Sequence, residues 1–228
     1  MSSTGRLHYN GQGVPQDYAQ AVQWFRKAAD QGNADAQNNL GLLYYKGQGV
    51  PQDYAQAIQW YRKAAGQGNA AAQNNLGSLY YNGQGVPQDY AQAVQWFRKA
   101  AHQGFAAAQY NLGLLYDNGQ GVPQDYVQAV QWYRKAADQE NGDAQNNLGV
   151  MYGKGKGVGK NNIIAYALYN LSASKDQSGS NHSLSNRDNL ASLMPESDIE
   201  SAQTLTQQMI TKGVTAAIDN HFMLRHQN

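Results

Sequence analysis

The residues best suited to chemistry in this chain are a glycine–lysine run and two histidines near the C-terminus. The run Gly153–Lys160 has the composition of a phosphate-binding loop, but Lys154 stands at the leading glycine position of the Walker pattern and Asn161 at its Ser/Thr position. His221 and His226 are five residues apart, which is not a metal-ligand spacing on a helix. Without cysteine, no thiol nucleophile exists. The sequence therefore predicts no catalytic centre, no metal site and no cofactor.

Most of the chain is a repeat with a fixed period of 36 residues. The hexapeptide Gly-Val-Pro-Gln-Asp-Tyr occurs four times, with its proline at Pro15, Pro51, Pro87 and Pro123. A fixed period of this length indicates a stacked array in which each unit contacts mainly its neighbours. The run Gly153–Lys160 aligns with the loop of these repeats. We interpret it as a solvated connection, with an adventitious anion site as the alternative.

Each period predicts two helices joined by a loop. Apolar residues from Asn33 onward recur at spacings of three and four, which marks one helix face. The glycine-rich segment 46–51 is a loop, and Asp53 with Gln56 fits a capping box that starts the second helix. Helix pairs are predicted at 34–46 with 53–67, 70–82 with 89–103, 106–118 with 125–139, and 144–153 with 162–174.

Packing within and between units follows from small and aromatic residues. Gly41 lies inside a predicted helix, where glycine costs roughly 0.5–1 kcal/mol relative to alanine, so we expect a close approach there, with Ala57 as the partner. Large aromatics fill the space between units, and three tryptophans are predicted to be largely buried: Trp60, Trp96 and Trp132.

The N-terminal end of the array is incomplete. Residues 1–12 supply half of a first helix, so Val22, Phe25 and Ala29 are expected to be thinly covered. We predict weak self-association through this end, with a half-cap formed by residues 1–10 as the alternative. Either the first unit is truncated or the chain is an excerpt of a longer array. Localisation stays open: periplasmic or secreted if a leader was removed, cytoplasmic otherwise.

The repeat pattern decays toward the C-terminus. Glu140 replaces the glycine that ends the second helix elsewhere, so we expect that helix to run on with a shifted turn. A short helix is predicted near 185–194, and Pro195 opens a longer one that Gly213 ends. The tail from 214 to 228 is ambiguous, although Ala216, Ala217 and Phe222 could extend the cap. The predicted organisation is a repeat array at 1–171, a flexible connection at 172–185, and capping helices with a tail at 186–228.

The repeated residues resemble one family. The pattern Ala-x-x-x-Leu-Gly-x-x-Tyr-x-x-Gly-x-Gly-Val-x-x-Asp, followed by Ala-x-x-Trp-x-x-Lys-Ala-Ala-x-x-Gly, is similar to the Sel-one-like repeat of bacterial proteins, a relative of the tetratricopeptide repeat. The match covers about residues 5–170. The resemblance implies an all-α fold, a right-handed superhelical solenoid of helix–loop–helix repeats, which acts as a scaffold or adaptor.

Composition excludes several classes of protein. The net charge is +1 and charged residues make up 14%, so no basic face for nucleic acid is evident. No stretch approaches the roughly 18 apolar residues of a membrane span. A protein or peptide partner is therefore expected.

Comparison of the copies inside the chain suggests where such a partner binds. Six columns of the first helix are constant, whereas five vary, and similarity to the tetratricopeptide repeat implies that the variable columns face a concave groove. Neutral drift at exposed positions is the alternative. Asparagine in one column can donate to and accept from a peptide backbone, and Tyr81 with Tyr110 is the predicted energetic centre. The candidate groove residues are Asp35, Asn38, Leu42, Tyr45, Lys46, Asn74, Ser78, Tyr81, Asn82, Tyr110, Leu114, Asp117, Asn118, Asn146 and Val150.

Three functions from different classes fit the sequence. The leading hypothesis is a non-catalytic adaptor that binds a protein or an extended peptide. The second is an immunity or inhibitor protein that neutralises a secreted bacterial effector enzyme, which some members of the family resemble. The third, suggested by family associations alone, is a hydrolase acting on cell-wall material.

Overall fold

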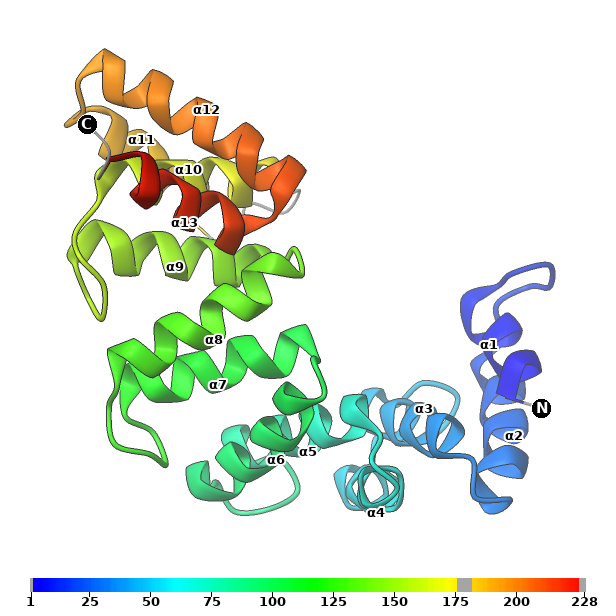
Figure 1. Ribbon diagram of the computed structural model, residues 1–228. Coiled ribbons are helices and arrows are strands. Elements are labelled where there is room, and N and C mark those ends of the chain that lie inside the picture. The colour runs from blue at the N-terminus through cyan, green and yellow to red at the C-terminus, as the bar shows by residue number, and fades with distance from the viewer. Residues whose placement is uncertain (1, 176–181, 226–228) are drawn as a thin grey trace. The chain divides into compact units, whose positions relative to one another are not determined.

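The computed structural model describes residues 2–175 and 182–225, and every regular element in these ranges is a helix (Figure 1). The first six are α1 (Ser2–Asn10), α2 (Tyr18–Asp30), α3 (Ala34–Lys46), α4 (Tyr54–Gly66), α5 (Ala70–Asn82) and α6 (Tyr90–His102). Next come α7 (Ala106–Asn118), α8 (Tyr126–Asp138), α9 (Gly142–Lys154) and α10 (Asn162–Lys175). The last three are α11 (Ser183–Ala191), α12 (Glu196–Lys212) and α13 (Val214–Arg225). The predicted all-α solenoid of helix pairs is confirmed.

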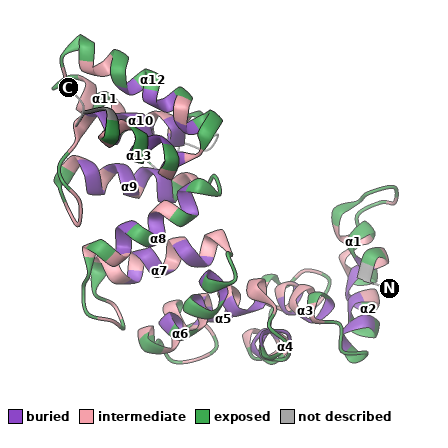
Figure 2. Ribbon diagram, viewed as in Figure 1, coloured by how far each residue is buried: buried purple, intermediate pink, exposed green. Residues whose placement is uncertain are grey.

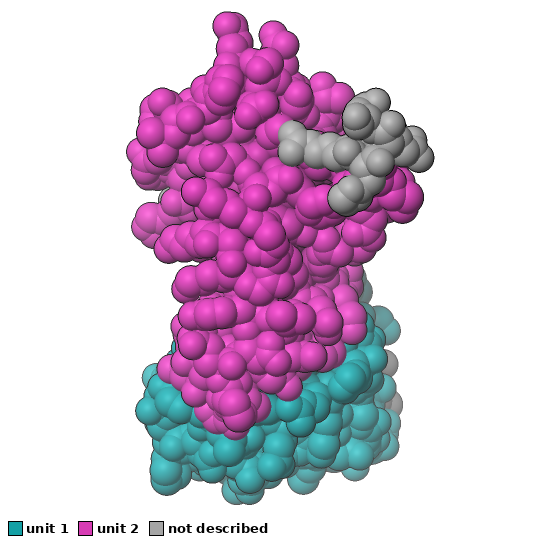
Figure 3. Space-filling view, turned by 60° about the vertical axis from the view of Figure 1, so that its left-hand side comes forward, with its two compact units in different colours: residues 1–105 teal, residues 106–228 magenta. Residues whose placement is uncertain are grey.

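The helices form two compact units (Figure 3). Residues 1–105 hold α1 to α6, and residues 106–228 hold α7 to α13. Inside the units, the two helices of each repeat pack against each other: α3 with α4, α5 with α6, α7 with α8, and α9 with α10. Within a unit, the second helix of a repeat also packs on the first helix of the next: α2 on α3, α4 on α5, and α8 on α9. Each repeat therefore buries its apolar faces against its own partner helix and its neighbour.

Caps explain why the helices begin at the same place in each period. Asp53 accepts a hydrogen bond from the backbone N–H of Gln56 at 2.9 Å, and Asn33 accepts one from Ala36 at 2.8 Å. The predicted capping box is only half present. The backbone N–H of Asp53 donates to the carbonyl of Tyr44 at 3.0 Å, so the side chain of Gln56 is not needed there. The same caps recur at Asn69, Asp89, Asp125 and Asn141, whereas Phe105 stands at the corresponding position before α7.

The two helices of a repeat meet closely at a buried glycine. A Cβ added to Gly41 would lie 2.7 Å from the ring of Tyr61 and 3.3 Å from the carbonyl oxygen of Ala57. The expected approach to Ala57 is therefore present, but the ring of Tyr61 comes closer still. Figure 2 shows the buried residues concentrated on the facing sides of each pair. Glycine is required here because any side chain would push the helices apart.

The tryptophans are less buried than predicted. Trp132 is 7% exposed, whereas Trp60 and Trp96 are half-buried. Trp60 and Trp96 do pack against the apolar cluster of the preceding repeat. Their outer faces carry the ammonium groups of Lys63 and Lys99, at 4.1 and 4.4 Å from the ring centroids. The aliphatic chain of a lysine therefore covers part of each tryptophan ring, where we expected side chains of the neighbouring repeat to cover it.

The expectation of a bare N-terminal end is wrong. Val22, Phe25 and Ala29 are all buried, with Phe25 only 1% exposed. The short helix α1 supplies the cover, because Gly5 sits against the ring of Phe25 as Gly41 sits against Tyr61. Half a first helix is enough, since the close contact lies in the half that is present.

The turn after α8 also differs from expectation. α8 ends at Asp138, in register with the other second helices, and Glu140 takes the left-handed backbone conformation with φ 65°. The N–H groups of Glu140 and Asn141 donate to the carbonyls of Ala137 and Ala136, as the corresponding residues do in other repeats. Asn141 then caps α9. These fixed bonds on both sides outweigh the cost of a left-handed glutamate, about 1–2 kcal/mol.

The C-terminal helices cover the last repeat. α12 begins after Pro195 and ends at Gly213 as predicted, and its residues Ala202, Leu205 and Met209 are buried. The tail forms a further helix, α13, in which Ala217 is buried and Phe222 packs on the core, while Ala216 is exposed. α13 folds back on α8, where the backbone N–H of Thr215 donates to Asp138 at 2.8 Å and Asp219 pairs with Arg134 at 3.2 Å.

The segment predicted as a flexible connection, 172–185, is helical at both ends, because α10 continues through Lys175 and α11 begins at Ser183. Its middle, 176–181, lies outside the described residues. The glycine–lysine run forms the end of α9 and the loop to α10, with the ammonium of Lys156 lying 4.7 Å from the ring centroid of Tyr126. Among the described helices, none combines the length and apolarity needed to cross a membrane.

Candidate protein-interaction site

The candidate residues stand on a rigid framework of buried amides. Gln37 is buried on α3, and its side-chain N–H donates to the carbonyl of Ala29 at 3.0 Å. Its side-chain oxygen accepts from Gln67, at the end of α4 in the same repeat, at 2.7 Å. The same pairing joins Gln103 to Gln73 at 2.8 Å and Gln139 to Gln109 at 2.7 Å. Because buried polar groups are costly when unpaired, the glutamine pairs fix how the two helices of a repeat pack, and the bond to Ala29 fixes how that repeat stacks on the preceding one.

A second polar link joins repeats through tyrosine. The guanidinium of Arg62 on α4 donates to the hydroxyl of Tyr80 on α5 at 2.9 Å, and Arg134 on α8 donates to Tyr152 on α9 at 2.6 Å. Arg26 makes the same bond to Tyr44. The columns that are constant in sequence are therefore the ones that hold the repeats together.

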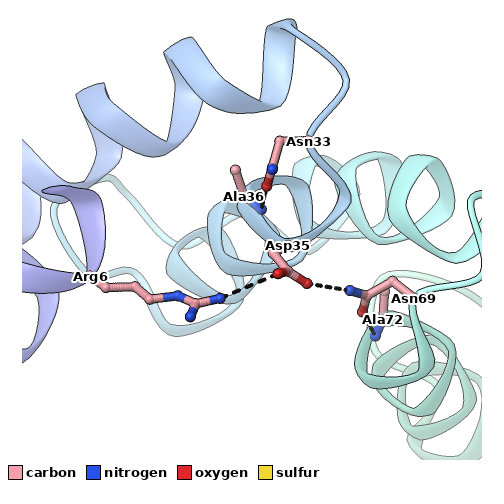
Figure 4. Close-up of polar contacts among 6 residues, drawn as sticks. All are labelled: Arg6, Asn33, Asp35, Ala36, Asn69 and Ala72. Carbon is pink, nitrogen blue, oxygen red and sulfur yellow. Dashed lines mark hydrogen bonds and ion pairs between the residues drawn. The ribbon is translucent and has the colours of Figure 1, made fainter. Parts of the chain in front are cut away.

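Asp35 begins the variable columns in the first unit (Figure 4). Its carboxylate accepts from the side-chain amide of Asn69 at 2.9 Å and pairs with Arg6 at 3.4 Å. Asn69 in turn caps α5 by accepting from the N–H of Ala72. Both ends of the Arg6–Asp35 pair are largely exposed, so water and salt screen it, and it contributes little to stability.

Two asparagines of one variable column make hydrogen bonds inside the protein, whereas we expected them to face a partner. The side-chain oxygen of Asn38 accepts from Asn75 of the next repeat at 3.0 Å. Asn146 is only 8% exposed, and its oxygen accepts from Asn186 on α11 at 2.9 Å. This burial contradicts the expectation that Asn146 lines an open groove, because α11 lies over it. Asn74 and Tyr110 in the same column are half-buried.

Three candidate residues of the first unit, Leu42, Tyr45 and Ser78, line one pocket of about 160 Å³. The remaining walls are Tyr61, Asn75 and Leu79. Tyr45 is held in place, because its ring packs on Tyr54 at 5.5 Å and its hydroxyl donates to Gln84 at 3.2 Å. Burial raises the pKa of Tyr61, with a smaller contribution from Tyr45, so its hydroxyl stays protonated at neutral pH. The pocket can hold an apolar side chain beside hydroxyl and amide groups.

The two residues of the predicted energetic centre belong to different compact units, Tyr81 to the first and Tyr110 to the second. Within its own unit, the ring of Tyr81 packs on Tyr90 at 5.4 Å. In the other unit, the ring of Tyr110 lies 6.1 Å from Tyr133. Three further candidates are exposed at the ends of first helices: Lys46, Asn82 and Asn118.

Asp117 in the second unit serves an internal partner. The buried hydroxyl of Tyr133 donates to its carboxylate at 3.3 Å and accepts from Asn147 at 3.5 Å. Burial, helped by the negative charge of Asp117, raises the pKa of Tyr133. The candidates Leu114 and Val150 are half-buried against the core of this unit. The variable position thus satisfies a buried hydroxyl in this repeat.

A second pocket, of about 230 Å³, lies between the last repeat and α11. Gly153, Lys154 and Tyr169 come from α9 and α10. The other wall consists of Asn186, Asn189, Leu190 and Leu193. Tyr169 follows Tyr61 by 108 residues, which is three periods, so both pockets lie beside the same repeat position.

Sequence reasoning missed the contribution of α11, although a signal was present. Asn186, Asn189 and Leu190 each follow Asn75, Ser78 and Leu79 by 111 residues, three periods and three residues. The bond from Asn186 to Asn146 accordingly repeats the bond from Asn75 to Asn38. α11 therefore acts as the first helix of a sixth repeat, and the one-turn offset concealed it.

Among the described side chains, no group of three or more His, Asp or Glu could hold a metal, and His226 lies outside the described residues.

The comparisons with known proteins agree with this architecture. The family described as Sel1 repeat matches residues 1–33, 34–69, 70–105, 106–141 and 142–177. A solved Sel1 repeat protein from Oxalobacter formigenes is similar, with 36% identity and a TM-score of 0.76 over 88% of this chain and 83% of that chain. A protective antigen of uropathogenic Escherichia coli that displays an SLR fold has 29% identity and a TM-score of 0.53 over 98% of this chain and 63% of its own. No curated protein matches the chain.

Proposed function

The chain belongs to the Sel1 repeat family, and from this we propose that it is a non-catalytic scaffold that binds a partner protein through the variable positions of its first helices. The observation that carries the proposal is the pocket at Leu42, Tyr45 and Ser78. Its walls combine these variable residues, which are half-buried, with the constant residues Asn75 and Leu79, of which Leu79 is buried.

The chemistry of this pocket suits a side chain from an extended polypeptide. The ring of Tyr45 and the side chain of Leu42 offer apolar contact, and a volume of about 160 Å³ accommodates one aliphatic group. The hydroxyl of Tyr61 at the base remains available as a donor at neutral pH, because burial raises its pKa. Tyrosines that are held rigid before binding lose little conformational entropy on complex formation, which favours them at interfaces.

Substitutions borrowed from the same columns test the proposal, because each introduces a residue that another repeat of this chain carries at the same position. Ser78→Leu introduces the residue that Leu42 and Leu114 show in this column, and it should fill the pocket. Tyr45→Asp introduces the residue of Asp117. In capture from the source organism's lysate followed by titration of the purified partner, both variants should weaken binding at least ten-fold.

Gln59→Ala, at an exposed position on α4, is the matched control and should bind as the parent chain does. If a captured partner binds the Ser78→Leu and Tyr45→Asp variants with unchanged affinity, the assignment of the first helices is wrong. If the partner is an enzyme whose activity falls on binding, the scaffold role is replaced by an inhibitor role.

A further inference from the structure

We propose that the pocket between α9, α10 and α11 binds the C-terminal residue of a partner polypeptide, taking its α-carboxylate together with an apolar side chain. This inference rests on the proposed function and names one feature of the partner. It concerns the second compact unit alone, and its residues lie 108 to 111 residues beyond those of the pocket at Tyr61.

Gly153 has no side chain, and its pocket of about 230 Å³ is larger than the pocket of about 160 Å³ in which Tyr45 occupies the same column. The same column carries Tyr45, Tyr81 and Asp117 in the earlier repeats. A Cβ built on Gly153 would lie 3.7 Å from the hydroxyl of Tyr169, so a larger side chain there would project over that hydroxyl. In the preceding repeat, Asp117 accepts the bond of the equivalent tyrosine, whereas Gly153 provides no acceptor for Tyr169. The absence of a side chain leaves this hydroxyl facing the pocket.

The polar groups around the pocket are suited to an anion. Lys154 contributes an exposed ammonium that forms no ion pair with any described residue, and Asn189 contributes an exposed side-chain amide. Tyr169 is 7% exposed, and burial raises its pKa to about 12, so its hydroxyl is a donor at neutral pH. No lining residue carries a carboxylate. A carboxylate bound here would accept charge-assisted hydrogen bonds, which are roughly twice as strong as neutral ones.

The opposite wall is apolar and open. Leu190 is half-buried, and Leu193, just beyond the end of α11, is 77% exposed. The backbone N–H of Leu193 donates to the carbonyl of Leu190 at 3.0 Å, which holds the two leucines at one turn. Exposure of a large aliphatic side chain is unfavourable unless something covers it, and burial of a leucine is worth about 1.5–3 kcal/mol.

The small size of the pocket selects a chain end over an internal segment. A carboxylate and an apolar group must both fit within about 230 Å³. In an extended chain, neighbouring side chains point to opposite sides, so an internal acidic residue and its apolar neighbour cannot enter together. A C-terminal residue carries its carboxylate and its side chain on one Cα. Its two groups can therefore reach Lys154 and Leu193 at the same time.

Three peptides and the full chain test the inference. The probe is acetyl-Gly-Ser-Gly-Ser-Leu with a free C-terminal carboxylate; its C-terminal amide and the same peptide ending in Gly are the comparisons. Binding is followed by NMR titration, in which the backbone amide signal of Gly153 and the side-chain amide signal of Asn189 are recorded. The free acid should shift these signals saturably. The amide and the Gly-ended peptide should each bind at least ten-fold more weakly.

Two variants with a matched control complete the test. Gly153→Tyr places the residue of earlier repeats in the pocket, and because a Cβ there makes only ordinary contacts, folding should be retained while binding is lost. Lys154→Met should weaken binding at least ten-fold, whereas Lys212→Met, at an exposed lysine of the same compact unit that does not line the pocket, should leave it unchanged.

The inference is overturned if the amide binds as well as the acid, if the folded Gly153→Tyr variant still binds, or if the acid does not bind at millimolar concentration. The proposed function is judged separately, because it depends on Ser78 and Tyr45. Partner capture that is lost in the Ser78→Leu and Tyr45→Asp variants, together with any of these three results, would retain the scaffold and remove only the C-terminal pocket.

Discussion

Replacing Gly77 by alanine should destabilise the protein even though alanine is the better helix former. Gly77 lies in the middle of α5, where it faces the ring of Phe97 on α6. A Cβ at this position would meet Cδ1 of that ring at 2.6 Å. The ring cannot rotate away freely, because Phe97 is itself 2% exposed and packed on all sides.

The size of the effect follows from two opposing contributions. To reach an ordinary contact of 3.4 Å, the ring and the helix must separate by about 0.8 Å. Overpacking of this kind typically costs about 1–3 kcal/mol, whereas glycine to alanine in a helix gains about 0.5–1 kcal/mol. The difference between the middle values of these ranges is a net loss of about 1 kcal/mol, which lowers Tm by roughly 2–4 °C for a chain of this length.

Gly66→Ala in the same compact unit is the control, because a Cβ there would have nothing within 4 Å. It should raise the free energy of unfolding by about 0.5 kcal/mol. Both variants are measured by urea unfolding with circular dichroism at the helical signal. The double variant Gly77→Ala with Phe97→Leu should lose less stability than the two single losses added together. A Gly77→Ala chain as stable as Gly66→Ala would refute the close-contact reasoning.

Three further predictions follow from single residues. Glu140→Gly should raise the free energy of unfolding by about 1 kcal/mol, because it relieves a left-handed backbone with φ 65°; an unchanged urea midpoint would contradict this. Burial raises the pKa of Tyr169 from 10.0 to about 12, so the folded state favours the neutral hydroxyl. The stabilisation that the neutral hydroxyl of Tyr169 provides is complete below pH 10 and is lost as the pH rises through about 12. The free energy of unfolding should therefore fall between pH 10 and about 12, and it should fall less steeply in the Tyr169→Phe variant. If the two chains show the same dependence of unfolding free energy on pH, the prediction is contradicted. Trp132→Ala should cost about 3–5 kcal/mol and Trp60→Ala clearly less, since Trp60 is half-buried; equal Tm losses would contradict the difference.

The sequence was sufficient for the repeated part of the fold. The 36-residue period, the caps at residues such as Asp53, and the helix bounded by Pro195 and Gly213 all reflect local rules, and the structure follows them. Four of the constant columns, those of Ala36, Gln37, Leu40 and Gly41, are buried, because packing residues such as Leu40 cannot change without loss of the core.

Backbone bonds at one turn and contacts with distant segments account for what the sequence did not predict. Local preference at Glu140 favours a longer helix, but bonds to Ala136 and Ala137 and the cap at Asn141 impose the shared turn. The cover of Asn146 comes from α11, 40 residues further along the chain, in a segment whose repeat pattern is offset by one turn. The pocket at Gly153 depends on the same helix, so neither could be located from the individual periods.

The glutamine pairs have a consequence for copy number. Gln67 pairs with Gln37, and Gln103 with Gln73, inside one repeat, and the first-helix glutamine also donates to the preceding repeat, Gln37 to Ala29 and Gln73 to Ala65. Deletion of one whole period, such as residues 70–105, would leave each remaining glutamine opposite partners of the same type. Deletion of part of a period would shift these glutamines out of register with the preceding repeat and leave buried amides without partners. The array can therefore be shortened or lengthened in steps of one period, and such chains should still fold.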